Sequence, residues 1–165
     1  MGSMMNKAII IMALFTGIIL ADNVEYKTVF RGEQKEVTPY VDGKPHGIAK
    51  WYWEDGAIRT ITPFENGNIN GTVEEYYQTG QIRATTEYVN GNRQGIQKDY
   101  RNGEVQREAP YENGVKNGIE KAYFQGGKIW QETPYVNDKI DGIQKEYDEK
   151  GNVVRETKYV NGVEQ

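Results

Sequence analysis

Few side chains in this sequence could act as nucleophiles, general bases or metal ligands. His46 is the only histidine, Ser3 is the only serine, and cysteine is absent. The run Met1-Gly2-Ser3 has the pattern of an expression scar, so a Ser–His–Asp nucleophile is excluded. Adjacent carboxylates such as Glu74 and Glu75 point to opposite faces of a strand, which does not suit shared acid–base chemistry. We therefore expect no enzyme activity, no metal ion and no cofactor, and we interpret His46 as a loop residue.

Aromatic and arginine side chains offer a different chemistry, the recognition of a partner protein. Trp, Tyr and Arg are the residue types that most often anchor protein interfaces. The sequence contains 3 tryptophans and 12 tyrosines. The predicted partner-binding residues are Trp51, Trp53, Tyr77, Arg101, Phe124 and Trp130. The alternative is that the tryptophans pack on a folded-back terminus or on a second copy of the chain.

Four lysines, at positions 50, 98, 121 and 145, recur at one position of a repeat, and Glu74 occupies that position in a fifth copy. They could form a positive column for phosphate groups or lipid headgroups. The alternative is that their stems lie over neighbouring tyrosine rings while the ammonium groups stay in water. The net charge of −4 argues against nucleic acid as a partner.

The repeat has a period of about 24 residues, and its units start near residues 40, 64, 88, 111 and 135, after a half repeat over 26–40. Aromatic residues mark each start, at Tyr40, Phe64, Tyr88, Tyr111 and Tyr135, and Tyr159 continues the spacing after the last unit. Two further columns keep the same spacing, and we assign them to the framework of the fold. They are Gly47, Gly71, Gly95, Gly118 and Gly142, and then Tyr52, Tyr76, Tyr100, Tyr123 and Tyr147.

Each unit contains two glycine-marked turns, separated by stretches in which Thr, Tyr, Ile and Val alternate with charged residues. This pattern is typical of strands, and dipeptides such as Asn66-Gly67 and Asn90-Gly91 supply the positive φ that tight hairpins need. No window spaces its apolar residues for a helix. The predicted fold class is all-β: an elongated single-layer antiparallel meander of about eleven strands, built from 24-residue β-hairpin repeats after an N-terminal leader.

Strand alternation assigns these residues to two faces. On the repeated face we place Ile48, Lys50 and Tyr52 of the first strand, and Ile58, Thr62 and Phe64 of the second strand form the matching set. The opposite parity differs from unit to unit. Its residues include Ala49, Trp51, Trp53, Val73, Glu75, Tyr77, Gln97, Asp99 and Arg101. Positions that vary between units are free of the framework requirement and can be shaped for a partner.

The pattern Tyr-x-Asn-Gly-x-x-x-Gly-x-x-x-x-Tyr-x-x-x-Gly resembles the MORN repeat, and more closely the bacterial MORN-variant repeat of antitoxin-like proteins. The resemblance covers about residues 26–165. It implies a single-layer, gently twisted sheet of successive hairpins that is used for binding or scaffolding. It also suggests neutralisation of a cognate toxin, as in some bacterial members of the family.

The N-terminal segment predicts export. Asn6-Lys7 precedes an uncharged run from Ala8 to Leu20, and Ala21 is a small residue after which cleavage could follow, as in a secretory leader. The run is short for a membrane span, and an uncleaved membrane anchor is the alternative. We therefore divide the chain into residues 1–21, the scar and leader, and residues 22–165, the repeat domain. The expected location is periplasmic, cell-surface or secreted.

Three functions stay open at this point. The first is an exported, non-catalytic protein-interaction module, the second is an immunity-type antitoxin, and the third is a peripheral membrane protein that binds lipid through the lysine column. The terminal strands of an open sheet invite pairing with another chain, so a homodimer is a further alternative.

Overall fold

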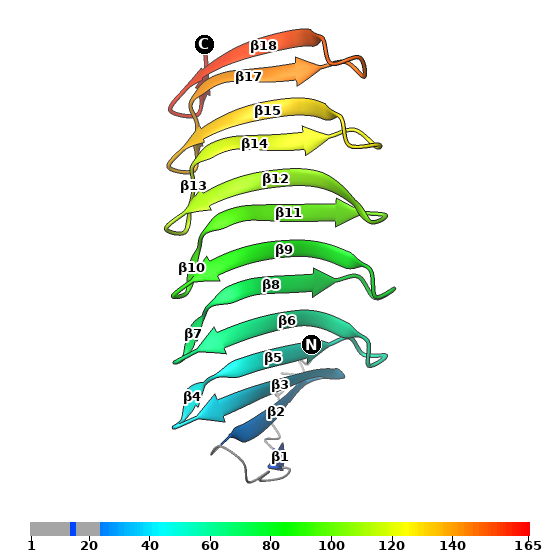
Figure 1. Cartoon of the computed structure of the whole chain (residues 1–165), viewed down its shortest axis with the longest axis vertical. Coiled ribbons are helices and arrows are strands. Elements are labelled where there is room, and N and C mark those ends of the chain that lie inside the picture. Colours follow the sequence, from blue (N-terminus) through cyan, green and yellow to red (C-terminus); the bar gives the residue numbers. More distant parts are fainter. Residues whose placement is uncertain (1–13, 16–23) are drawn as a thin grey trace, which may run out of the picture.

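The chain folds as one open antiparallel β-sheet, which a computed structural model describes for residues 14–15 and 24–165 (Figure 1). The described residues contain no helix, and so none that is long and apolar enough to cross a membrane. This confirms the predicted all-β meander of hairpin repeats. The predicted scar and leader fall largely on residues 1–13 and 16–23, outside the described residues.

Six hairpins follow one another along the sheet, and each pairs with the next. Their strands are β2 (Glu25–Arg31) and β3 (Gln34–Val41), β5 (Gly47–Tyr52) and β6 (Ile58–Glu65), β8 (Gly71–Tyr76) and β9 (Ile82–Val89), β11 (Gly95–Arg101) and β12 (Glu104–Glu112), β14 (Gly118–Tyr123) and β15 (Ile129–Val136), and β17 (Gly142–Tyr147) and β18 (Val153–Val160). These are twelve long strands where about eleven were expected. The difference arises because the leading half repeat forms a complete hairpin, in which Glu25 pairs with Tyr40.

Two-residue strands complete the sheet along the margin where one hairpin passes to the next. They are β4 (Lys44–Pro45), β7 (Asn68–Ile69), β10 (Asn92–Arg93), β13 (Val115–Lys116), β16 (Lys139–Ile140) and β19 (Val163–Glu164), and β1 (Leu14–Phe15) pairs with β2. The turns before them have the predicted geometry, for example Asn66 and Gly67 at φ of 51° and 92°. Asp138, which replaces the expected glycine, also takes a positive φ of 66°.

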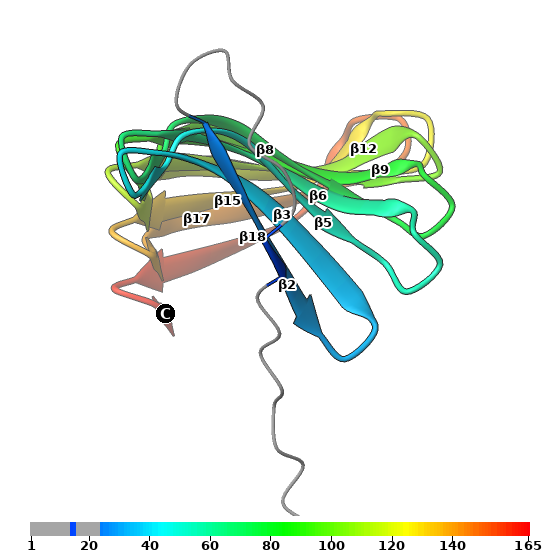
Figure 2. The same cartoon turned by 90° about the horizontal axis from the view of Figure 1, so that it is seen from below.

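Residues that pair across antiparallel strands point to the same face, so the register defines two faces. The threonine face carries the column Thr38, Thr62, Thr86, Ala109, Thr133 and Thr157. The lysine face carries Lys50, Lys98, Lys121 and Lys145, together with the tyrosine column that begins at Tyr52. Seen from one end, the sheet is arched, and its two rows of turns lie along opposite margins (Figure 2).

A β-bulge near the start of the second strand corrects one prediction. Trp51 pairs with Thr60, but the next residue, Tyr52, pairs with Ile58, so Arg59 is the extra residue of the bulge. The set Ile58, Thr62 and Phe64 is therefore split, with Ile58 on the lysine face and the other two on the threonine face. The same shift occurs in the next four hairpins. Simple alternation fails here because a bulge inserts one residue and reverses the parity on one side of it.

Within the described residues the sheet has no thick core. Apart from Pro39, its buried residues are small or β-branched and belong to the threonine face: Ala49, Ala84, Ala109, Thr38, Thr62, Thr86, Thr133 and Thr157. No large side chain is fully buried among the described residues. The predicted framework glycines have a steric reason, because a Cβ at Gly142 would lie 2.9 Å from Cγ of Pro134 at a φ of 124°. Stability must therefore come mainly from cross-strand neighbours.

Candidate partner-binding face

A continuous row of side chains crosses the threonine face next to the threonine column. In strand order, the paired residues are Glu36, Trp51, Thr60, Glu75, Ala84, Asp99, Arg107, Ala122, Gln131, Glu146 and Arg155. Nearly every unit contributes a different residue type to this row. The threonine face is thus uniform at the threonine column and irregular two residues further along each strand, as expected for a surface that meets a partner.

Arginines stack on the tryptophans at the N-terminal end of this face. The guanidinium of Arg31 lies 5.5 Å from the ring centre of Trp51, and that of Arg59 lies 4.8 Å from the ring centre of Trp53. Arg59 Nη1 also donates a hydrogen bond of 3.1 Å to Gln34 Oε1. These contacts hold the indoles in place. The Nε1–H of Trp53 is buried and has no hydrogen-bond partner among the described residues.

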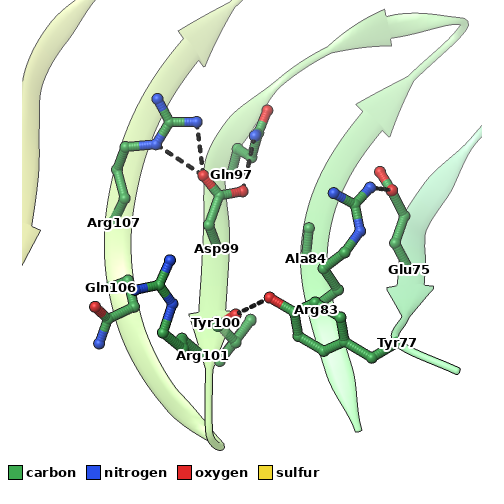
Figure 3. A pocket seen from close by; sticks show the side chains of 10 residues that line it. All are labelled: Glu75, Tyr77, Arg83, Ala84, Gln97, Asp99, Tyr100, Arg101, Gln106 and Arg107. Atoms are coloured by element: carbon green, nitrogen blue, oxygen red, sulfur yellow. Dashed lines mark hydrogen bonds and ion pairs between the residues drawn. The ribbon is translucent and has the colours of Figure 1, made fainter. Parts of the chain in front are cut away.

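Two hollows lie side by side over the middle of the face. The first has a volume of about 400 Å³, and its lining includes Tyr77, Arg83, Asp99, Arg101 and Arg107 (Figure 3). The second, of about 380 Å³, shares Glu75, Tyr77 and Arg83 with the first and adds Trp53 and Arg59. Because Tyr77 and Arg83 line both hollows, the two form one surface, which we name the central hollow.

Ion pairs hold the arginine and carboxylate side chains at the base of the central hollow in place. Arg83 pairs with Glu75, and Arg107 Nε donates a hydrogen bond of 2.7 Å to Asp99 Oδ2. Gln97 Nε2 donates a further hydrogen bond of 3.1 Å to Asp99. Figure 3 shows Arg107 reaching toward Asp99 and Arg83 reaching toward Glu75, each on a neighbouring strand. The carboxylates at the base are therefore already engaged by arginines.

The charge network continues beyond the hollow into a more enclosed region. Lys116 Nζ lies 2.5 Å from Glu120 Oε2, and both side chains are mostly buried, with 15% and 13% exposed. Lys116 also lies 4.3 Å from the ring centre of Tyr135, whose pKa is raised by burial and by the charge of Glu120. Burial would lower the pKa of Arg107, but its hydrogen bond to Asp99 and the charges of Asp99 and Glu120 outweigh this, so the pKa is raised. Arg107 thus stays a cation.

The lysine face has a different electrostatic character. Across the C-terminal strands, lysine and glutamate alternate in register as Lys98, Glu108, Lys121, Glu132, Lys145 and Glu156. Lys98 Nζ lies 3.3 Å from Glu108, and Lys145 Nζ lies 3.7 Å from Glu156. Among the described residues, none of the four column lysines makes a cation–π contact with a tyrosine. Three of the four lysines in the predicted positive column, Lys98, Lys121 and Lys145, therefore have a carboxylate on an adjacent strand, whereas Lys50 pairs with Val37 and Ile61.

The structure brings four of the six predicted binding residues together. Trp51, Trp53, Tyr77 and Arg101 lie along the threonine face, and three of them line the central hollow. Phe124 and Trp130 belong to the hairpin of β14 and β15 and do not line the central hollow; Trp130 is the extra residue of the bulge there and is 37% exposed. His46 lies in its predicted loop, where its Nδ1 accepts a hydrogen bond of 3.4 Å from the backbone N–H of Asn66.

Sequence reasoning missed Arg59, Arg83 and Arg107. Arg107 lies two residues from Ala109 of the threonine column, and it pairs with Asp99 on the neighbouring strand. The alignment of these two strands could therefore have predicted its place on the threonine face. Arg59 and Arg83 are the extra residues of their bulges, so alternation gave no signal for them. The bulge turns both side chains toward the threonine face, where they meet Trp53 and Glu75.

The fold and this face define an open, single-layer β-repeat protein whose two faces differ in composition. A family model described as the MORN repeat variant matches residues 45–66, 69–90, 116–137 and 140–161. The chain belongs to this family, whose repeats generally serve as protein- or membrane-binding modules and are typically non-catalytic. Residues 91–115 lie between two of the matched ranges. A comparison with curated proteins finds no match.

Proposed function

We propose that this protein is a non-catalytic, exported interaction module that binds a partner protein through its threonine face. The observation that carries the proposal is the central hollow, where Trp53 and Tyr77 lie beside Arg59 and Arg83. Aromatic and arginine side chains that are held in place by their neighbours lose little conformational entropy on binding and are the usual anchors of interfaces. The lysine face carries the regular tyrosine column, whereas Trp51, Trp53 and the arginines that line the hollow lie on the threonine face.

The third alternative, lipid binding through the lysine column, is disfavoured by the register. An anionic membrane surface is recognised by clusters of uncompensated cations. On the lysine face each of Lys98, Lys121 and Lys145 has a glutamate on a neighbouring strand. A protein partner on the opposite face therefore accounts better for where the irregular, aromatic residues lie.

The partner-binding proposal is tested by site-specific photo-crosslinking in the native host. A photoreactive amino acid is placed at Tyr77 on the threonine face or, as a matched control, at Thr85 on the lysine face of the adjacent strand. We expect a discrete crosslinked protein from position 77 and none from position 85. Equal crosslinking from both positions, or none from either, would contradict the proposal.

Export is proposed from the leader pattern of residues 1–21 and is tested separately. Cells that express the full chain are fractionated and compared with cells that express a variant lacking residues 6–21. We expect the repeat domain outside the cytoplasm only when these residues are present, and N-terminal sequencing identifies whether cleavage follows Ala21. Recovery of both forms from the cytoplasm would overturn the proposal of export without affecting the binding face.

An immunity-type antitoxin is a narrower form of the same proposal, in which the partner is a toxin. It predicts a toxin gene beside the gene of this chain, and co-expression should rescue cells that produce this toxin. A threonine-face variant such as Trp53→Ala should lose the rescue. No toxin-like neighbour, or rescue by the variant as efficient as by the wild type, would count against it.

A further inference from the structure

Every arginine of the chain lies on one face of the sheet. The sequence contains seven arginines, and all of them belong to the threonine face by register, ion pairs or ring contacts: Arg31, Arg59, Arg83, Arg93, Arg101, Arg107 and Arg155. The recurrent cations of the opposite face are lysines. Arginine presents a planar, bidentate donor group that suits carboxylates and aromatic rings, so this separation indicates a face built for directional contacts.

Six of these arginines are engaged within the sheet. Arg31, Arg59 and Arg93 lie over aromatic rings, and Arg83, Arg107 and Arg155 pair with carboxylates of the preceding strand. Arg101 has neither kind of contact nor a hydrogen bond within the described part of the chain. Glu104 pairs with Arg101 in register, but its carboxylate accepts a hydrogen bond of 3.1 Å from the backbone N–H of Gly126 instead. The guanidinium of Arg101 is therefore free, and it lines the central hollow (Figure 3).

The unit that contains Arg101 is built differently from the others. Four residues lie between Tyr100 and Val105, whereas five lie between Tyr52 and Ile58, so the turn between β11 and β12 is one residue shorter. The two-residue turn extends β11 by one position, so that Arg101 pairs with Glu104 inside the sheet, while Trp53 and Tyr77 follow the ends of their strands. This unit is also the stretch that lies between the matched ranges of the family model.

The central hollow is positive in a protein that is negative overall. Its lining contains four arginines and two carboxylates, Glu75 and Asp99, a net charge of +2, whereas the whole chain carries −4. Arg83 and Arg107 are compensated by those carboxylates, whereas Arg59, which is stacked on Trp53, and Arg101, which is free, keep an uncompensated charge. The flanking carboxylates disfavour a dianionic phosphate more than a single carboxylate, and Trp53 and Tyr77 add apolar surface beside the charge.

We propose that the central hollow binds an acidic segment of the partner protein, with a carboxylate of this segment paired to Arg101 and an apolar side chain against Trp53 and Tyr77. This inference rests on the proposed function and specifies the chemistry of its partner. The hollow extends over six neighbouring long strands, from β5 to β12. At about 4.8 Å per strand this span is matched by about seven extended residues at about 3.3 Å each.

The test presents the immobilised full chain with a random peptide library displayed on phage, about 12 residues long so that an extended segment can cross the hollow. Enriched peptides are synthesised, and their affinities are measured by fluorescence anisotropy for the wild type, Arg101→Glu, Arg101→Gln and Trp53→Ala. Lys158→Glu is the matched control, because it makes the same charge change on the lysine face. Circular dichroism verifies that each variant is folded.

We expect the enriched peptides to be rich in Asp and Glu with an apolar residue between them. Arg101→Glu should weaken their binding about tenfold or more, and Arg101→Gln should weaken it less, while Lys158→Glu leaves it unchanged. Binding should also weaken as salt rises from about 0.05 M to about 0.5 M. The hollow is open to solvent, so dissolved ions screen the attraction between the Arg101 guanidinium and the peptide carboxylate.

Several outcomes would overturn the inference, and they separate it from the proposed function. Uncharged or basic peptides that are lost on Trp53→Ala would refute an acidic partner but leave the binding face standing. Peptides that bind all variants equally, or no enriched peptide at all, would count against both. Binding to phosphatidylglycerol vesicles that is lost on Arg101→Glu, without enrichment of acidic peptides, would assign the hollow to lipid instead.

Discussion

The hydroxyl of Tyr77 donates a hydrogen bond of 2.9 Å to the backbone carbonyl oxygen of Tyr100. A side chain of one hairpin is thereby tied to the backbone of the next, immediately beside Arg101. Because the sheet has no thick core, such links between hairpins are a large part of what makes the central hollow a defined surface.

Removing this hydroxyl tests the link. Tyr77→Phe should lower the free energy of unfolding by about 1 kcal/mol, the usual net contribution of a hydrogen bond, while the ring remains in place. Urea denaturation followed by tryptophan fluorescence measures the change. Tyr76→Phe is the control, because within the described chain the Tyr76 hydroxyl donates only to Glu74 of its own strand, and we expect a smaller effect. Equal losses in the two variants would show that the link between hairpins has no special role.

The close approach of Pro134 to Gly142 predicts that alanine at position 142 lowers the free energy of unfolding more than alanine at position 127 does. Gly142→Ala should destabilise the protein by about 1–3 kcal/mol more than Gly127→Ala, because its Cβ would lie 2.9 Å from Cγ of Pro134 while a Cβ at Gly127 meets open space. Both variants share the cost of about 1–2 kcal/mol for a side chain at positive φ. Thermal denaturation of the two variants gives the difference. Similar melting temperatures would exclude the steric explanation.

The mostly buried ion pair of Lys116 and Glu120 should contribute more to the free energy of unfolding than the exposed pair of Arg155 and Glu146. Glu120→Gln leaves the mostly buried Lys116 without its partner and should cost about 3 kcal/mol of unfolding free energy. Glu146→Gln removes the partner of Arg155, which is 61% exposed at a distance of 3.9 Å, and should change stability by less than about 0.5 kcal/mol. Chemical denaturation of both variants measures this contrast. If Glu120→Gln is as mild as Glu146→Gln, the network contributes little.

The lysine face predicts a pH dependence at alkaline pH. Burial and the hydrogen bond to Glu108 raise the pKa of Tyr123 to about 12. A pKa above the unfolded value of about 10 means that the folded state holds this proton more tightly. The stabilisation is therefore complete below about pH 10 and is lost as pH rises through about 12.

Substitution of the acceptor tests this assignment. Glu108→Gln should lower the pKa of Tyr123 but leave it above the ordinary value, because burial remains. Carbon-13 NMR of labelled tyrosines measures the titration, with Tyr123→Phe to assign the signal. The pKa of Tyr76, raised to about 12 mainly by its hydrogen bond to Glu74, should not change. A Tyr123 titration that is unaffected by Glu108→Gln would contradict the assigned hydrogen bond.

The sequence by itself determined the hairpin array, because its signals are local. A positive φ at Asn66 and Gly67 follows from the residue types of the turn, and strand alternation follows from the extended backbone. The face that contains Trp51 and Tyr77 could therefore be predicted from parity alone. The repeat spacing also placed Gly142 and its equivalents in the framework, although the residue that each glycine faces, Pro134 for Gly142 and Glu87 for Gly95, could not be inferred.

Only the tertiary structure decided which charges meet. The bulge at Arg59 and Arg83 reverses parity, so the arginines that complete the central hollow could not be assigned to a face beforehand. The pairing of Lys98 with Glu108, and of Arg107 with Asp99, depends on register between strands, which no residue fixes alone. Local turn chemistry can be predicted from short segments, whereas the electrostatics of a sheet depend on how neighbouring strands align.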